Sequence, residues 1–435
     1  MRLPYGRGFL EVELPPDADI IEPRHSPGLP DEQAAIAEAL RRPRSGRPLS
    51  ERVRDGDSVG IVVCDVTRPF PAARVLPVLI EQLQGHRVTV YVATGTHRSC
   101  TAAELESMLG RDVLERTTVV QHDCFDRPRH SSLGTVPGSD VPALVEKSFL
   151  EEDVRITTGF IEPHFFAGFS GGPKMVAPGL AALETVLELH SAARIGHPNA
   201  RWGIVDGNPI HDAVRDIASR ADVTFNLDVA LNRDHQITGV FAGDLFDSHR
   251  LGCGFVRETA MVPADGLYDV VLTTNSGYPL DQNLYQTVKG MSAAAQIVKP
   301  GGAIVVVSRC SDGMPEHGSY KDLLAQSATP EDFLRTIEQP GFVQHDQWQV
   351  QIQAMIRLRA RVFLKNEGVS DALLRQAWLE PVDDVSATIA RLMKEVGPEA
   401  RIGVLPDGPQ TVPFVQAAVN DQVWTAGSPR ARRFQ

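Results

Sequence analysis

Short runs of β-branched and apolar residues recur along the chain, and stretches with a helical spacing of apolar positions separate several of them. The runs that predict strands are 58–64, 87–93, 153–160, 267–277, 299–310 and 400–408. Helices are predicted over 71–85, 101–110 and 384–397 and near 31–42. Alternation of strands and helices favours an α/β fold with parallel or mixed sheets flanked by helices.

The length of 435 residues predicts two domains, because a single hydrophobic core rarely grows to that size. A fresh strand-loop-helix unit opens after residue 262. We therefore expect an N-terminal α/β domain over 1–262 and a C-terminal α/β domain over 263–396. The last segment, 397–435, contains one more strand, which either returns to the first domain or stays with the second.

Composition narrows the class of protein. Hydrophobic residues make up 42% of the chain, which suits a globular fold, and the net charge of −12 argues against a nucleic-acid partner. The short basic stretch RARRF at the C-terminus reads as a solvated end. Five cysteines without C-x-x-C spacing argue against a disulfide scaffold and against a structural zinc site. No signal peptide or membrane-length apolar run is seen, so we expect a cytoplasmic protein.

Polar residues follow the predicted strands, where ligands of open parallel sheets bind. DVTRP places Asp65 and Arg68 after the first strand, either as a turn with a local ion pair or as part of a site. ATGTHR presents His97 after the second strand, either as an exposed loop histidine or as a general base.

HFFAGFSGGPKM, residues 164–175, carries His164, Lys174 and a glycine-rich loop. The run departs from G-x-x-x-x-G-K-[ST] at two of its required positions, which disfavours a nucleotide triphosphatase. Its glycine amides could still bind one phosphate. His190 then shares a helical face with apolar residues, as either a core histidine or a metal ligand.

In the second half, GYPLDQNLYQTVKG brings Tyr285, Gln286 and Lys289 close together on a helix. Gln286 and Lys289 are three residues apart and share one face. They could bind a carboxylate, or they could form a solvated helix surface.

Together, these stretches resemble the nickel-dependent lactate racemase family, in this order and over most of the chain. The resemblance implies an isomerase, a racemase or epimerase of a 2-hydroxy acid, with its active site in an interdomain cleft. Nickel and a nickel-pincer nucleotide (pyridinium-3-thioamide-5-thiocarboxylic acid mononucleotide), supplied by cofactor-biosynthesis enzymes, are the implied cofactors. The reaction implied is reversible hydride transfer through a 2-keto acid.

The resemblance also implies roles for individual residues. Lys174 matches the covalent attachment point, His190 the nickel ligand, and His97 and His164 the acid/base pair. The residues expected to contact the cofactor are Asp65, Gly168, Ser170, Gly171 and Gly172. Those expected to contact the substrate are Arg68, Tyr285, Gln286, Lys289 and Trp348.

Alternatives remain open at this point. The substrate could be lactate, malate, an aromatic 2-hydroxy acid or a sugar acid, and the oligomeric state is not indicated. From other classes, a non-catalytic phosphate- or nucleotide-binding module would reuse the glycine loop. A zinc hydrolase would use the three histidines, although no H-E-x-x-H motif supports it.

Overall fold

The computed structural model describes residues 1–24, 26–316 and 318–415, and this part of the chain forms two compact units. The first unit contains residues 26–190 and 199–259. The second unit contains 1–24, 191–198 and the described residues from 260 onward. The chain therefore divides near residue 260, but two earlier segments, 1–24 and 191–198, also belong to the second unit. A single boundary in the sequence does not predict these two segments.

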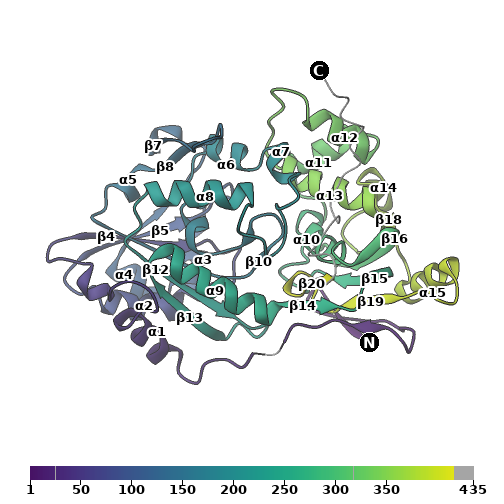
Figure 1. Cartoon of the computed structure of the whole chain (residues 1–435), viewed down its shortest axis with the longest axis horizontal. Coiled ribbons are helices and arrows are strands. Elements are labelled where there is room, and N and C mark those ends of the chain that lie inside the picture. The colour runs from purple at the N-terminus through teal and green to yellow at the C-terminus, as the bar shows by residue number, and fades with distance from the viewer. Residues whose placement is uncertain (25, 317, 416–435) are drawn as a thin grey trace, which may run out of the picture. The chain divides into compact units, whose positions relative to one another are not determined.

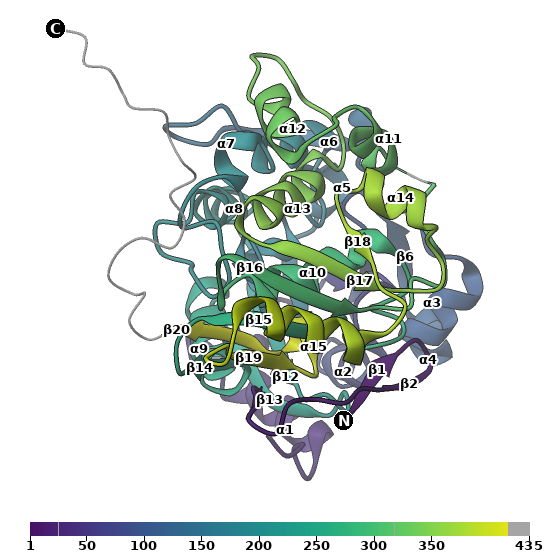
Figure 2. The ribbon, with the colours of Figure 1, turned by 90° about the vertical axis from the view of Figure 1, so that its right-hand side faces the viewer.

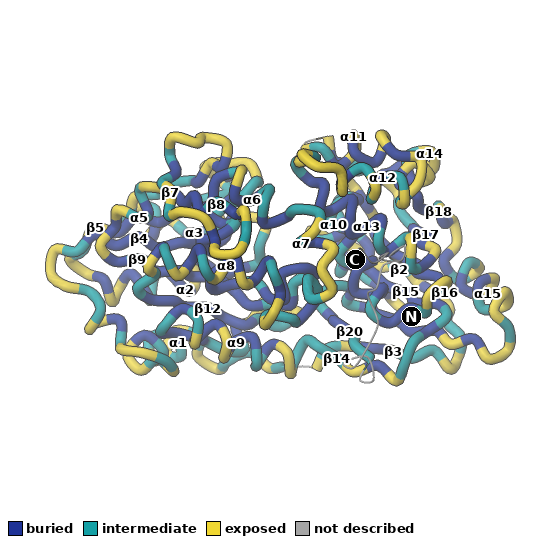
Figure 3. The backbone as a smooth tube through the Cα atoms, turned by 45° about the horizontal axis from the view of Figure 1, so that its top comes forward, coloured by how far each residue is buried: buried dark blue, intermediate teal, exposed yellow. Residues whose placement is uncertain are grey.

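A six-stranded mixed sheet forms the centre of the first unit (Figure 1). Five of its strands run parallel, and only the edge strand β13 is antiparallel to its neighbour. Its order is β13 (Ile237–Gly243), β12 (Phe225–Leu231), β9 (Val154–Phe160), β4 (Ser58–Cys64), β5 (Arg87–Ala93) and β6 (Thr118–Gln121). Every residue of β4 is buried, because neighbours cover this central strand on both sides and both faces (Figure 3).

Helices flank the sheet of the first unit. They are α1 (Glu32–Arg41), α2 (Ala72–Glu81), α3 (Ala102–Leu109), α4 (Arg111–Arg116), α5 (Lys147–Leu150), α6 (Leu183–Leu189), α8 (Pro209–Arg220) and α9 (Leu245–Ala260). Helix α1 packs against α2 and β13. At the start of α3, Thr101 and Glu104 form a capping box, which satisfies backbone N–H groups that the first turn leaves without partners.

Short elements connect the larger ones in this unit. β7 (His130–Thr135) and β8 (Pro142–Glu146) form an antiparallel hairpin. β10 (Pro163–His164) and β11 (Gly168–Phe169) form a second, two-residue hairpin directly after β9. The 3-10 turn η3 (Gly172–Met175) follows and contains Lys174. Two further 3-10 turns are η1 (Leu49–Glu51) and η2 (Arg127–Arg129).

The second unit has its own six-stranded sheet, in which every pair of neighbouring strands is parallel. Its order is β18 (Glu380–Pro381), β17 (Arg361–Lys365), β16 (Val298–Val307), β15 (Tyr268–Thr274), β19 (Ile402–Leu405) and β3 (Asp19–Ile20). Outside it, β1 (Arg2–Tyr5) pairs with β2 (Gly8–Glu11), and β14 (Met261–Ala264) pairs with β20 (Val412–Val415). The first residues of the chain belong to this unit because they supply one of its edge strands.

Helices cover this second sheet as well. They are α7 (Ala192–Ile195), α10 (Leu284–Ala294), α11 (Tyr320–Ala325), α12 (Pro330–Ile337), α13 (Gln347–Arg359), α14 (Asp371–Gln376) and α15 (Val385–Val396). Helix α15 lies across β15 and β16 (Figure 2) and buries Val385, Ile389 and Leu392 in a core shared with these strands. Helix α7 packs against α13, which explains why residues 191–198 belong to this unit.

The α/β fold predicted from the sequence is confirmed, with helices flanking one mixed and one parallel sheet. The described part of the last segment contributes β19 and β20 to the second unit and the turn η4 (Gly408–Gln410) between them. The basic stretch RARRF lies outside the described residues. Across the described chain, no helix combines the length and the apolar character needed to cross a bilayer.

Candidate active site

Three predicted site residues follow three adjacent parallel strands of the first unit. Asp65 comes directly after β4, His97 follows β5, and His164 follows β9. The order β9-β4-β5 places these strands side by side, so their carboxyl ends meet at one edge of the sheet. This edge is where ligands of open α/β sheets bind.

Asp65 and His97 form a hydrogen-bonded pair at this edge. Nδ1 of His97 lies 2.8 Å from Oδ2 of Asp65, and the Thr67 hydroxyl donates to Oδ1 at 2.7 Å. Burial of Asp65 opposes its ionisation, but these hydrogen bonds and the charges of His97 and Arg68 hold its pKa below the usual value. The carboxylate accepts Nδ1–H of His97 in either charge state of the ring, so Nε2 is the nitrogen that can gain or lose a proton.

Arg68 closes the turn that Asp65 begins. Its backbone N–H donates to the carbonyl of Asp65 at 3.2 Å, and its guanidinium donates to the Thr67 hydroxyl at 3.2 Å. The predicted turn is therefore present. The carboxylate of Asp65 faces His97 and Thr67, so this turn positions a histidine, and Arg68 is half-exposed beside it.

The glycine-rich segment forms a tight loop above the end of β9. Gly168 adopts φ +80°, and a Cβ on it would lie 2.2 Å from the carbonyl oxygen of Ile204, so only glycine fits. The Ser170 hydroxyl donates to the carbonyl of Phe160 at 2.8 Å and accepts the N–H of Glu162 at 2.9 Å. These contacts fasten the loop to the strand.

The next two glycines approach a buried carboxylate. The Gly172 N–H donates to Oδ2 of Asp228 at 2.9 Å, and a Cβ on Gly171 would lie 3.1 Å from Oδ1 of that carboxyl. Since the amides of Ser170 and Gly172 bond within the protein, the phosphate-cradle geometry of a nucleotide triphosphatase loop is not reproduced at these two positions.

Phe166 brings three of the predicted residues together. Its ring centroid lies 4.4 Å from that of His164 and 5.1 Å from that of His190, in edge-to-face arrangements. The ammonium of Lys174 lies 5.8 Å from the same ring. An amine and two imidazoles that are far apart in sequence thus surround one buried aromatic side chain.

The two histidines beside Phe166 have defined hydrogen-bonding patterns. His190 is buried and caps the C-terminal end of α6. Its Nδ1 lies 2.6 Å from the carbonyl oxygen of Val186, and since a carbonyl can only accept a hydrogen bond, Nδ1 is the donor. This leaves Nε2 as the basic nitrogen, as in a metal-ligating histidine. Nδ1 of His164 instead accepts the N–H of Ala167 at 3.3 Å, so its neutral ring carries the hydrogen on Nε2.

The predicted substrate residues of the second unit lie on α10 and α13. Nε1 of Trp348 on α13 donates to the Tyr285 hydroxyl on α10 at 3.3 Å, so two of the predicted residues contact each other. Asn283 caps α10 by accepting the N–H of Gln286, and Lys289 lies one turn further along. Tyr285, Gln286 and Lys289 are each half-buried at the start of the helix that follows β15.

Comparison with known proteins identifies the family. Residues 5–203 match the lactate racemase N-terminal domain, and residues 264–412 match the lactate racemase C-terminal domain. The lactate racemase of Thermoanaerobacterium thermosaccharolyticum is 33% identical over 418 residues, which cover 94% of this chain and 97% of that protein. The chain belongs to the lactate racemase family. The resemblance seen in the sequence is thereby confirmed, as is the assignment to the isomerases, since racemases are isomerases.

Two further relatives extend this result. The lactate racemase of Lactiplantibacillus plantarum is 36% identical over 384 residues, covering 87% of this chain and 90% of its own. The lactate racemase apoprotein structure from T. thermosaccharolyticum matches with a TM-score of 0.89 at 32% identity, covering 95% of this chain and 99% of that one. A Thermotoga maritima protein matches with a TM-score of 0.68 at 19% identity, covering 90% and 100% of the chains, and shows a shared fold.

Sequence reasoning missed three residues that contact the predicted site residues. Phe166 looked like one of several apolar residues, although it contacts three site residues. Thr67 lies inside DVTRP but drew no attention, and its hydroxyl orients Asp65. Asp228 was detectable as the one acidic residue in the apolar strand β12, FNLDVAL.

Proposed function

We propose that this protein is a 2-hydroxy-acid racemase or epimerase, with lactate as the first candidate substrate, that works through a lysine-tethered nickel-pincer nucleotide. The observation that carries the proposal is the arrangement around Phe166. An amine for attachment, an imidazole suited to metal binding and a second imidazole suited to proton transfer surround one ring. Malate, an aromatic 2-hydroxy acid and a sugar acid are alternative substrates within the same chemistry.

The residues present fit such a cofactor. We assign Lys174 as the attachment point and His190 as the nickel ligand. The bond from Nδ1 of His190 to the Val186 carbonyl fixes the ring and leaves Nε2 as a donor to a metal. When bound, the cofactor supplies an acceptor for the hydrogen that leaves the substrate carbon as hydride. Loading requires cofactor-biosynthesis enzymes as partners.

The two proposed acid/base histidines hold their protons differently. His97, with Nδ1–H bonded to Asp65, offers a basic Nε2, and His164, with Nδ1 accepting from Ala167, offers Nε2–H. Nε2 of His97 can take the substrate's hydroxyl proton, whereas His164 can return a proton only as an imidazolium, which forms when Nδ1 gains a proton and releases the Ala167 N–H. A reaction that runs in both directions between mirror-image substrates needs both forms at once.

Binding of the substrate carboxylate needs cations and hydrogen-bond donors. Arg68 offers a guanidinium next to the Asp65–His97 pair, held by the Thr67 hydroxyl. In the second unit, we propose Lys289, Tyr285 and Gln286 as further substrate contacts and Trp348 as an apolar one. The bond between Trp348 and Tyr285 supports a common role for these two residues.

Intact mass and metal analysis of protein from cells that make the cofactor tests the attachment. We expect a nucleotide-sized adduct on Lys174 with about one nickel per chain. Lys174→Ala should lose the adduct, whereas Lys147→Ala, at an exposed lysine, should keep it. An adduct on the Lys174→Ala protein would refute the proposal. An unmodified wild-type protein that binds nucleotide reversibly would favour the binding-module alternative, and stoichiometric zinc with no adduct would favour the hydrolase.

An isotope experiment tests the reaction itself. A 2-hydroxy acid carrying deuterium on C2 should keep that deuterium in the product of opposite configuration, because hydride transfer does not exchange with water. Washout of the label into solvent would show proton abstraction and contradict the proposal. Both His97→Ala and His164→Ala should keep the adduct, and the turnover rate of each should fall by a factor of about 10²–10⁴.

A further inference from the structure

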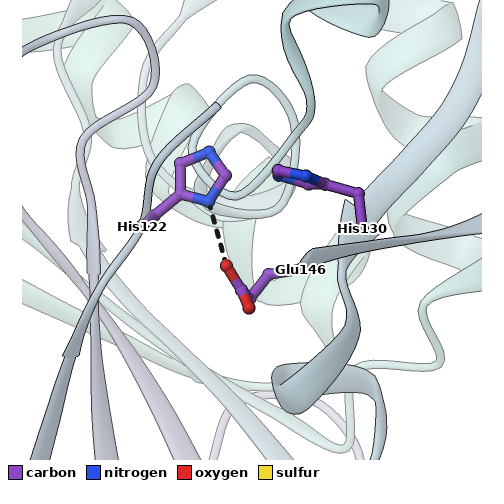
Figure 4. Close-up of side chains that lie close together, drawn as sticks. All are labelled: His122, His130 and Glu146. Atoms are coloured by element: carbon purple, nitrogen blue, oxygen red, sulfur yellow. Dashed lines mark hydrogen bonds and ion pairs between the residues drawn. The ribbon is translucent and has the colours of Figure 1, made fainter. Parts of the chain in front are cut away.

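A second cluster of donor side chains lies in the first unit, on elements that the proposed reaction does not use. His122 follows the edge strand β6, His130 begins β7 and Glu146 ends β8. All three are buried, with 1%, 5% and 2% of their surfaces exposed. One ring nitrogen of each histidine and one oxygen of Glu146 lie within 4.8 Å of one another (Figure 4).

The hydrogen bonds of His122 determine which of its nitrogens carries the lone pair. Nε2 lies 3.1 Å from the carbonyl oxygen of Ala181, which can only accept, so Nε2 carries the hydrogen. In the neutral ring, Nδ1 then directs its lone pair at Oε2 of Glu146, 3.4 Å away. Two electron pairs that face each other repel, so this arrangement needs a positive charge between them.

His130 directs a second lone pair into the same place. Its Nδ1 lies 3.0 Å from the carbonyl of Asp126 and therefore carries the hydrogen. Its Nε2 is buried and has no hydrogen-bond partner among the described residues. Burial also lowers the pKa of this ring, which keeps it neutral and keeps the lone pair on Nε2.

Glu146 is an anion in this cluster. The Arg129 guanidinium lies 3.0 Å from Oε2 and the Ser148 hydroxyl donates to Oε1 at 3.0 Å, and both contacts stabilise the ionised carboxylate. A carboxylate and two imidazole lone pairs therefore converge. Each imidazole has its other nitrogen bonded to a backbone carbonyl, which is the usual second contact of a metal-ligating histidine.

We propose that His122, His130 and Glu146 form a structural binding site for a divalent metal ion of the zinc type. A second proton on His122 would relieve its contact with Glu146 but would leave the lone pair of His130 unused. A metal ion satisfies both histidines and the carboxylate. Two imidazoles and one carboxylate are a ligand set that zinc accepts, and calcium and magnesium prefer oxygen ligands alone.

The geometry requires a small contraction on binding. Ligand atoms around tetrahedral zinc lie about 3.4 Å apart, so the donors must move inward by roughly an ångström. Arg129 is the competing cation, because its guanidinium lies 3.0 Å from Oε2 of Glu146. Its side chain is 30% exposed, so it can retain contact with solvent while a metal ion takes the inner side of the carboxylate.

The site would hold the chain between Lys174 and His190. His122 bonds to Ala181, the Glu146 N–H donates to the Leu180 carbonyl, and Leu183 donates to the Cys124 carbonyl at the start of α6. Helix α6 ends at Leu189, and His190 is its C-terminal cap. A metal ion would fasten the edge strand, the β7–β8 hairpin and this segment together, and so act as a positioning element for His190.

Zinc titration of the full chain tests the proposal. Because His190 could itself bind zinc, the titration uses His190→Ala protein, made without the cofactor and stripped with chelator. We expect one zinc ion per chain, and cobalt(II) in its place should give the visible absorption of a tetrahedral site. His130→Gln and Glu146→Gln, each in the His190→Ala protein, should abolish binding. Arg129→Gln should tighten it about fivefold, as expected for loss of one part-exposed competing charge.

Folding of each variant is checked by circular dichroism. If His130→Gln fails to fold, Glu146→Gln alone tests the site, because glutamine has nearly the same side-chain volume as glutamate. A His190→Ala protein that binds no zinc would overturn the proposal. So would zinc binding that neither His130→Gln nor Glu146→Gln weakens. A doubly protonated His122 ring in nitrogen NMR of protein that takes up no metal would show that a proton resolves the cluster instead.

Discussion

Asp228 gives the most quantitative prediction, because it is a buried carboxyl under the lysine loop. Its Oδ2 accepts hydrogen bonds from the Gly172 N–H at 2.9 Å and from Nδ2 of Asn226 at 3.1 Å. Its Oδ1 is buried without a partner among the described residues. Burial raises the pKa of this carboxyl to about 7, against the two hydrogen bonds, which lower it.

The raised pKa makes part of the folding stability depend on pH. The pKa of this carboxyl is about 4 in the unfolded chain and about 7 in the folded protein. Between these two pH values the folded protein keeps the proton, whereas the unfolded chain has lost it. Stability therefore falls as pH rises through this window, by about 1.4 kcal/mol per unit and about 4 kcal/mol in all. Asp228→Asn keeps the oxygen acceptor and replaces the protonated oxygen by an amide, so it lacks this dependence.

Calorimetry of the wild type and Asp228→Asn from pH 4 to pH 8 measures the effect. As pH rises, the Tm of the variant should increase relative to the Tm of the wild type. The difference between the two Tm values should change by roughly 8–16 °C across the range for a unit of this size. Titrations elsewhere cancel in this difference. A gap that stays constant from pH 4 to pH 8 would refute the reasoning and show that Asp228 is charged in the folded protein.

Three substitutions test other parts of the structure. Asp65→Asn should lower turnover by about 10²–10⁴ without loss of bound cofactor, since His97 loses the carboxylate that fixes its ring; unchanged turnover would contradict the pairing. Gly168→Ala should destabilise the first unit by about 1–3 kcal/mol or more, measured by denaturant unfolding, because its Cβ meets the Ile204 carbonyl at φ +80°. Thr101→Ala should cost about 1 kcal/mol through the lost cap of α3, without affecting turnover.

Local patterns in the sequence were sufficient for several of the elements and for the fold class. The run 58–64 is apolar throughout because β4 is covered on both faces, and apolar runs of this kind signal a central parallel strand without reference to other parts of the chain. The capping box at Thr101 was readable for the same reason, since its partners lie three residues apart. The family motifs also lie in short segments.

Pairing across long distances in the sequence was decided only by the tertiary structure. Residues 1–24 join the second sheet because β3 pairs with β19 nearly four hundred positions later, and no local signal encodes that register. His190 was placed on a helical face, but the helix is short and ends at Leu189, so the histidine is its final cap. The helical spacing of apolar residues does not tell where a helix stops.

The sequence by itself determined which chemical groups the protein has and which of them directly follow a strand. Only the tertiary structure decided which of those groups meet and which nitrogen of each histidine carries a hydrogen. Asp65 meets His97, Phe166 gathers His164 and His190, and Gly172 faces Asp228 through contacts between distant segments. The physical reason is that hydrogen bonds and burial act between neighbours in space, and the folded chain alone defines those neighbours.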